Sequence, residues 1–195
     1  MKVSSNLEKY QSKNFLKKIF IKRFIRQIVE TVQSLKINSI LDAGCGEGLI
    51  MHNIIKKIPE IKINGFDISN SALKNAKKIL PSSYFFQGDI TNIKLFDNFY
   101  DLAIALEILE HLENPEAALK ELKRATKKYC LISVPWEPFF SLGNLFCGKN
   151  VKRFGRDKEH LQFWNRGQII DLVSEYFDII SVKVSFPWTI ILGKK

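Results

Sequence analysis

Residues 38–48 read Asn-Ser-Ile-Leu-Asp-Ala-Gly-Cys-Gly-Glu-Gly, and the rest of the chain can be placed around this stretch. Ile40 and Leu41 are typical of the end of a buried strand, and a helical pattern follows from Leu49. Three glycines at alternate positions lie between the two. Glycine tolerates positive φ and lets a ligand approach the backbone closely. A strand, a glycine turn and a helix in this order predict a nucleotide-binding turn at the start of an α/β domain.

The spacing of the glycines narrows the kind of ligand. Gly44, Gly46 and Gly48 form Gly-x-Gly-x-Gly, whereas dinucleotide-binding enzymes carry Gly-x-Gly-x-x-Gly. Asp42 lies just before the turn, where its charge would repel a pyrophosphate. A cationic ligand without phosphate fits this arrangement better.

The stretch from Leu41 to Gly48 resembles the first motif of class I S-adenosylmethionine (SAM) methyltransferases. The resemblance covers about residues 35–195 and implies SAM as the cofactor. It implies that Gly44, Gly46 and Gly48 contact the methionine part of SAM and that Asp42 lies beneath it.

Two further motifs follow the glycine turn. Asp67 ends a predicted strand about 20 residues later, where an acid accepts hydrogen bonds from ribose hydroxyls in both NAD and SAM enzymes. Ile68, the next residue, is predicted to pack against the adenine. By resemblance, Asp89 accepts from the adenine amino group and Ile90 lines the ring. Together with the turn, these positions predict a complete SAM site.

The pattern along the chain predicts an α/β fold, a doubly wound Rossmann-like sheet of about seven strands with helices on both faces. Strands are expected at 39–41, 62–67, 84–87, 100–105, 129–134, 179–184 and 186–192, and helices at 14–35, 49–58, 71–80, 115–126 and 166–176. The resemblance implies that the final strand is antiparallel. Ligands of such sheets bind at the carboxyl ends of the strands.

At 195 residues the chain is expected to be a single domain, 1–195. We divide it into an N-terminal basic helix extension, 1–36, and a catalytic core, 37–195. No stretch approaches the roughly 20 apolar residues of a membrane span. The three cysteines are odd in number and widely spaced, which indicates reduced thiols and a cytoplasmic location.

The net charge is +10, and it is concentrated at the N-terminus. Residues 1–36 contain nine lysines and arginines against Glu8 and Glu30. Such an end can meet nucleic acid, an anionic membrane or an acidic substrate, or it can be a solvated helix face. The predicted helix 14–35 has apolar residues at three- and four-residue steps. We favour packing on the domain over peripheral membrane contact, and both remain open.

The segment after the fourth predicted strand carries a candidate catalytic group. Glu107, Glu110 and His111 have a spacing that puts three side chains on one helix face, and His160 offers a further imidazole. Such a group can hold a divalent cation or supply acid and base. Similar segments occur in ubiquinone-biosynthesis O-methyltransferases and small-RNA 2′-O-methyltransferases. That resemblance implies a metal site (Mg, Mn or Zn) of Glu107, Glu110, His111 and His160. A metal-free catalytic role for His111 and Glu107, or a structural one, stays open.

We therefore predict a SAM-dependent methyltransferase that acts on a hydroxyl of a small molecule. RNA 2′-O-methylation and a non-catalytic SAM-binding partner protein are the alternatives. Residues 135–163 are rich in aromatic and basic side chains and follow a strand that ends at the cleft. They predict an anionic or aromatic acceptor, and the alternative of a solvated loop that covers the edge of the sheet stays open.

Overall fold

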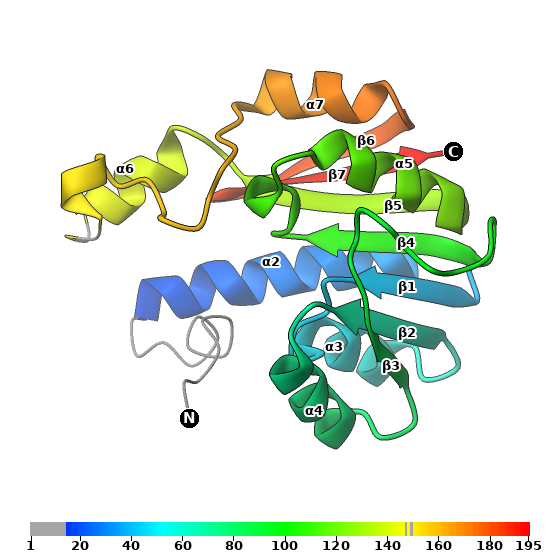
Figure 1. Cartoon of the computed structure of the whole chain (residues 1–195). Coiled ribbons are helices and arrows are strands. Elements are labelled where there is room, and N and C mark those ends of the chain that lie inside the picture. Colours follow the sequence, from blue (N-terminus) through cyan, green and yellow to red (C-terminus); the bar gives the residue numbers. More distant parts are fainter. Residues whose placement is uncertain (1–14, 147, 149) are drawn as a thin grey trace.

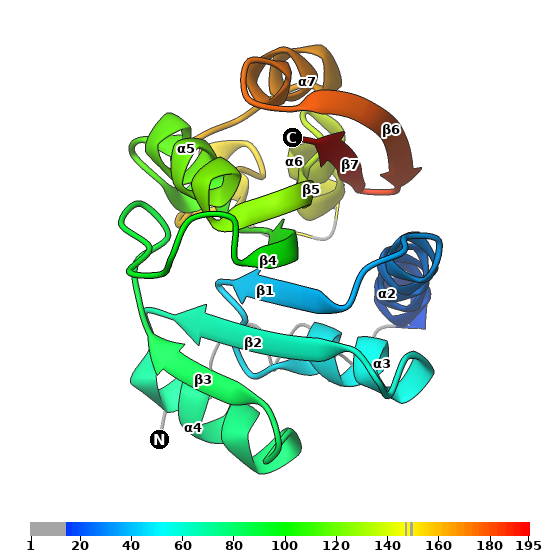
Figure 2. The ribbon, with the colours of Figure 1, turned by 90° about the vertical axis from the view of Figure 1, so that its right-hand side faces the viewer.

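The computed structural model describes residues 15–146, 148 and 150–195. A single seven-stranded sheet runs through the molecule (Figures 1 and 2). Its strands are β1 (Ser39–Ala43), β2 (Lys62–Asp67), β3 (Tyr84–Gln87), β4 (Tyr100–Leu106), β5 (Thr126–Pro135), β6 (Asp178–Ser185) and β7 (Trp188–Lys194). They lie side by side in the order β3-β2-β1-β4-β5-β7-β6. The order reverses between β1 and β4, which makes that point the switch point where ligands bind in such folds.

The first five strands of the sheet, from β3 to β5, are parallel. Strand β7 is antiparallel to both β5 and β6, between which it lies. The predicted doubly wound sheet with a final antiparallel strand is therefore confirmed.

The helices are α2 (Phe15–Gln33), α3 (Leu49–Lys57), α4 (Asn70–Ile79), α5 (Pro115–Ala125), α6 (Phe139–Phe146) and α7 (Arg166–Ser174), with two short 3-10 turns, η1 (Leu109–His111) and η2 (Val151–Arg153). Helix α4 begins one residue before its predicted start, and the Ser69 hydroxyl accepts from the Ala72 amide and caps the first turn. Helix α6 lies within residues 135–163, where the sequence predicts no helix.

Alternating side chains of the strands pack into two separate hydrophobic cores, one on each face of the sheet. On β1, Ile40 packs with residues of α2, α3 and α4, whereas Leu41 packs with residues of α5 and α7. Figure 2 shows α2 and α3 on one side of the sheet and α5 on the other. Helices on both faces are thus confirmed, and both faces of the central strands are apolar for this reason.

Helix α2 packs on the sheet through its second half. Phe24 is 4 % exposed, and Ile28 and Val32 are fully buried in the core that also holds Ile40. Lys183 of β6 donates to the Thr31 hydroxyl at 2.9 Å. Packing of this helix on the domain is therefore part of the fold. The rest of the predicted extension, residues 1–14, lies outside the described residues, and among those described no helix is long and apolar enough to cross a membrane.

Candidate active site

The glycine turn folds over the carboxyl end of β2. The amides of Gly44 and Cys45 both donate to the Phe66 carbonyl, at 2.8 and 2.9 Å. Gly44 has φ +77°, and a Cβ there would lie 2.3 Å from Cδ1 of Ile108. Gly48, with φ +75°, begins α3 from the left-handed region. The turn therefore needs glycine for its backbone conformation and for its close approach to the loop after β4.

Asp67 is at the carboxyl end of β2, as predicted, and it holds the turn in place. Its two carboxylate oxygens accept from the amides of Gly46 and Ser69, at 2.9 and 2.8 Å. An ionised carboxylate has about four acceptor positions, so these bonds leave room for ligand hydroxyls. The ribose contact of Asp67 stays a prediction.

The turn is surrounded by carboxylates. Asp42 is 4 % exposed, and burial together with the charge of Asp67 raises its pKa to about 7. Burial, with Asp67 next to it, also raises the pKa of Glu47. The pKa of the Cys45 thiol is raised by burial and by Asp42 and Asp67, which argues against a nucleophilic thiolate. Clustered acids of this kind favour a cationic ligand.

The predicted adenine contacts divide into exposed and buried residues. Ile68 is 74 % exposed, which is unusual for an isoleucine. Asp89 is exposed, and its Oδ1 accepts from the amide and hydroxyl of Thr91, both at 2.8 Å. Ile90 is only 6 % exposed and belongs to the core. The adenine-lining role stays a prediction, and Ile68 fits it better than Ile90.

The predicted single helix over residues 107–111 is wrong. The 3-10 turn η1 begins only at Leu109, and Glu107 has φ +59°. This backbone turns the Glu107 carboxylate toward β5 and β7, where it accepts from the Ser133 hydroxyl at 3.0 Å and from the Trp188 indole. Glu107 is therefore not part of the group formed by the other three predicted metal ligands.

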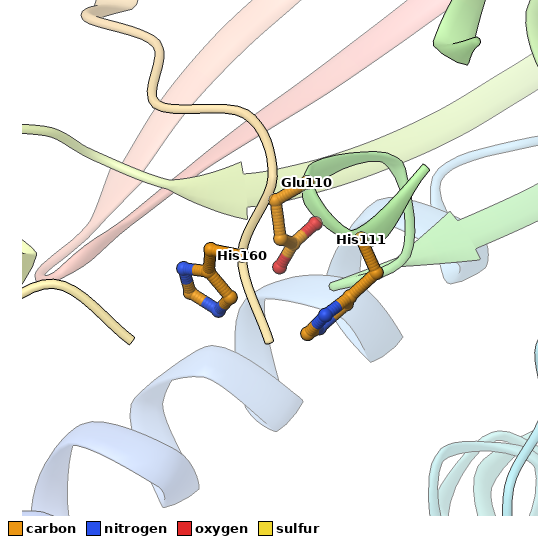
Figure 3. A group of neighbouring side chains, drawn as sticks. All are labelled: Glu110, His111 and His160. Atoms are coloured by element: carbon orange, nitrogen blue, oxygen red, sulfur yellow. The ribbon is translucent and has the colours of Figure 1, made fainter. Parts of the chain in front are cut away.

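Glu110, His111 and His160 do come together (Figure 3). One ligand atom of each lies within 4.8 Å of the others. Glu110 is 1 % exposed and His160 is 4 % exposed, and the two imidazole rings meet edge to face with centroids 4.9 Å apart. We call these three residues the Glu-His-His cluster. His111 and His160, 49 positions apart in sequence, thus meet in one cluster in which Glu110 and His160 are buried and His111 is half-buried.

Backbone bonds hold the Glu-His-His cluster together, a feature that sequence patterns did not indicate. The amides of Leu161 and Gln162 donate to the Glu110 carbonyl, at 2.8 and 3.0 Å. The Gln162 side chain donates to the Leu112 carbonyl at 3.1 Å. Nδ1 of His111 lies 2.8 Å from the Glu159 carbonyl. The segment 159–162 is therefore fastened to η1, which fixes both imidazoles.

A family model described as "Methyltransferase domain" matches residues 36–166, more than half of the chain. The demethylmenaquinone methyltransferase of Thermotoga maritima is 23 % identical over 171 residues, covering 77 % of this chain and 74 % of the relative. The ubiquinone biosynthesis O-methyltransferase of Nitrosomonas europaea is 28 % identical over 109 residues, covering 53 % and 45 %. The chain spans between 37 % and 74 % of the length of the first three curated relatives that it matches.

The solved structures agree on the fold. The magnesium protoporphyrin IX methyltransferase of Synechocystis PCC 6803, crystallised with bound S-adenosylhomocysteine (SAH), superposes with a TM-score of 0.73. It is 16 % identical in sequence, and the match covers 98 % of this chain and 95 % of that one. The family match and the glycine turn at the switch point agree with each other, and the chain belongs to the class I SAM-dependent methyltransferases.

Proposed function

We propose that this enzyme transfers the methyl group of SAM to a hydroxyl oxygen of a small-molecule acceptor bound beside His111. The observation that carries the proposal is the 2.8 Å contact between Nδ1 of His111 and the Glu159 carbonyl. A carbonyl oxygen only accepts, so Nδ1 carries the proton. The Nε2 atom of the neutral ring is then an acceptor, which a general base requires.

SAM would be held by the turn and the acids around it. The methionine end of SAM is proposed to contact Asp42, Gly44, Gly46 and Gly48. The ribose is proposed to contact Asp67. Asp89 and Ile68 are proposed to contact the adenine. The acidic surroundings support this orientation, because the sulfonium is the cationic part of the cofactor.

The chemical step is an in-line displacement. The acceptor oxygen forms a bond to the methyl carbon while the bond from that carbon to sulfur breaks. The electron pair of the broken bond stays on sulfur, which leaves SAH. The hydroxyl proton passes to Nε2 of His111. The protein contributes chiefly position and charge, since a preorganised acceptor and cofactor lower the barrier without covalent participation.

A divalent metal in the Glu-His-His cluster is a second proposal for the same site. A carboxylate and two imidazoles suit a divalent transition metal, and a ligand imidazole commonly donates its other N–H to a carbonyl, as His111 does. Ligand atoms about 2.1 Å from one ion lie at most about 4.2 Å apart, so these side chains would have to move inward slightly. A bound ion would lower the pKa of the acceptor hydroxyl.

The acceptor is proposed to be anionic or aromatic. A cavity of about 430 Å³ is lined by Arg153, Phe154, Arg156 and Phe163. The Arg156 guanidinium lies 4.8 Å from the Phe163 ring centroid, and that ring is 6.2 Å from the ring of His160. A planar acceptor with a carboxylate or phosphate would therefore have partners for its charge and its ring next to the Glu-His-His cluster.

The proposal is tested with SAM and paired phenolic acceptors, one bearing a carboxylate and one neutral, with products identified by mass spectrometry. We expect O-methylated product, preferentially from the carboxylate-bearing acceptor. His111→Gln should remove turnover while calorimetry shows unchanged SAH binding. If His111→Gln retains full turnover, or if methyl is found only on carbon or nitrogen, the proposed role of His111 is wrong.

A further inference from the structure

One end of the molecule gathers most of its exposed large apolar side chains. Of the fourteen such side chains among the described residues, eight belong to α2, α6, η2 with the residue that follows it, and the turn between β6 and β7. They are Phe15, Ile19, Phe139, Leu142, Phe146, Val151, Phe154 and Phe186. Phe146 is 90 % exposed and Phe15 is 73 % exposed. We call this surface the apolar-basic face, because two of the segments that form it, α2 and η2, also carry exposed cations. Large exposed apolar surfaces of this kind mark interaction sites.

Ring contacts join these segments into one surface. The ring centroids of Phe20 on α2 and Phe186 are 5.5 Å apart, and those of Phe186 and Phe139 on α6 are 6.5 Å apart. The side-chain amide of Asn144 donates to the Gly155 carbonyl at 3.0 Å, which fastens the segment after η2 to α6. In Figure 1 the start of α2 and the whole of α6 extend past the carboxyl edge of the sheet, on the same side of the molecule.

Cations dominate the charge on these segments, and Glu30 near the end of α2 forms an ion pair with Arg26 at 3.3 Å. Residues 15–29 and 139–156 contain nine lysines and arginines and no aspartate or glutamate. Lys18, Lys22 and Arg23 are exposed on α2, and Lys152 and Arg153 are exposed on η2. A surface that combines exposed apolar side chains with cations is complementary to a bilayer that carries anionic lipid.

We propose that the apolar-basic face binds the surface of an anionic phospholipid bilayer. Apolar side chains such as Phe146 and Leu142 would enter the acyl boundary while the cations meet the headgroups. A single-stranded nucleic acid also uses cations and aromatic rings, but the exposed aliphatic side chains Ile19, Leu142 and Val151 offer no ring on which a base can stack. A bilayer accounts for both the aromatic and the aliphatic members of the face.

The face also adjoins the active site. Phe140 of α6 has its ring 5.4 Å from the ring of His160, so α6 connects the apolar-basic face with the Glu-His-His cluster. A bilayer bound at this face would lie on the side of the molecule to which the strands β1 and β4 point (Figure 1). An acceptor dissolved in the bilayer would then approach His111 without crossing water.

Co-sedimentation with vesicles tests the proposal, using the full chain and phosphatidylcholine with or without phosphatidylglycerol. We expect binding to vesicles that contain phosphatidylglycerol, only in part reversed by salt. Phe146→Ser and Phe15→Ser should each weaken binding about tenfold, because each removes a large apolar side chain from the acyl boundary. The matched control is Phe96→Ser, at a phenylalanine that is 80 % exposed but outside the face, and it should have no effect.

The cations are tested in the same way. Lys18→Gln and Lys152→Gln should each weaken binding about fivefold, and Lys62→Gln, at the first residue of β2, should not. An unchanged thermal shift with SAH shows that each variant is folded, and it keeps this test separate from that of acceptor methylation. Three results would overturn the proposal: no sedimentation with anionic vesicles, equal effects of Phe96→Ser and Phe146→Ser, or full displacement by single-stranded RNA without any effect of Phe146→Ser.

Discussion

Replacing Asp42 by asparagine should stabilise the ligand-free protein while weakening its binding of SAM. Asp42 is 4 % exposed, and its pKa rises from 3.8 in the unfolded chain to about 7 in the fold, through burial and the charge of Asp67. At about 1.4 kcal/mol for each pH unit, this interval corresponds to at most about 4 kcal/mol of lost stability at pH 8. Asparagine has a similar shape and no charge, so Asp42→Asn does not lose this stability at high pH.

The sign of the effect depends on pH. Below about pH 4, Asp42 is protonated in both the folded and the unfolded chain, and its ionisation costs the fold nothing. As pH rises to about 7, Asp42 ionises in the unfolded chain but stays protonated in the folded protein. The stability of the wild type therefore falls relative to that of Asp42→Asn. Above about 7 the difference is constant. For a chain of this size it corresponds to roughly 10 °C in melting temperature.

The assay is thermal and denaturant unfolding of wild type and variants across this pH range, with Asp101→Asn as the matched control. Asp101 is also buried, which pushes its pKa up, but the amide of Asn38 and the charge of Lys128 outweigh burial and hold the pKa below its usual value. Asp101→Asn should therefore destabilise the protein at neutral pH. The reasoning is refuted if both variants destabilise at pH 8, or if the Asp42→Asn difference does not change with pH.

Three further predictions concern the turn and the Glu-His-His cluster. Gly44→Ala should destabilise the fold by about 1–2 kcal/mol and weaken SAH binding in calorimetry, because φ is +77° and the new Cβ meets Ile108; wild-type binding would contradict this. His111→Ala should lower kcat by about a hundredfold or more with SAM affinity near wild type, and loss of SAM affinity would show that His111 acts in cofactor binding. Mn²⁺ or Zn²⁺ should raise the melting temperature of the SAH-bound wild type and not of His160→Ala, and equal shifts in both would exclude the proposed metal site.

The sequence predicted the fold most closely where local chemistry and tertiary packing agree. Strands β2 and β3 begin and end at the predicted residues. Helix α6 was missed because residues 139–146 contain no charged side chain and include Gly143 and Asn144, which are more typical of turns than of helices. That helix is held by contacts with residues distant in sequence, such as Gly155.

The site was predictable to a similar extent. Asp42, the glycines and Asp67 follow from spacing, and the approach of His160 to Glu110 and His111 follows from the family resemblance. The position of Glu107 does not, since it depends on a positive φ and on hydrogen bonds from β5 and β7. The raised pKa of Asp42 is equally invisible in sequence, because it arises from burial and from a carboxylate on the neighbouring strand.

The central claim is that an acidic glycine turn recognises the cation of SAM. Calorimetry of SAM and SAH with the wild type, about one pH unit below and above 7, tests it directly, because the two ligands differ in the sulfonium charge. We predict that both bind, that the affinity ratio of SAM to SAH rises with pH as Asp42 ionises, and that Asp42→Asn abolishes this rise. No heat of binding for either ligand, or a ratio that is the same at both pH values, would contradict the claim.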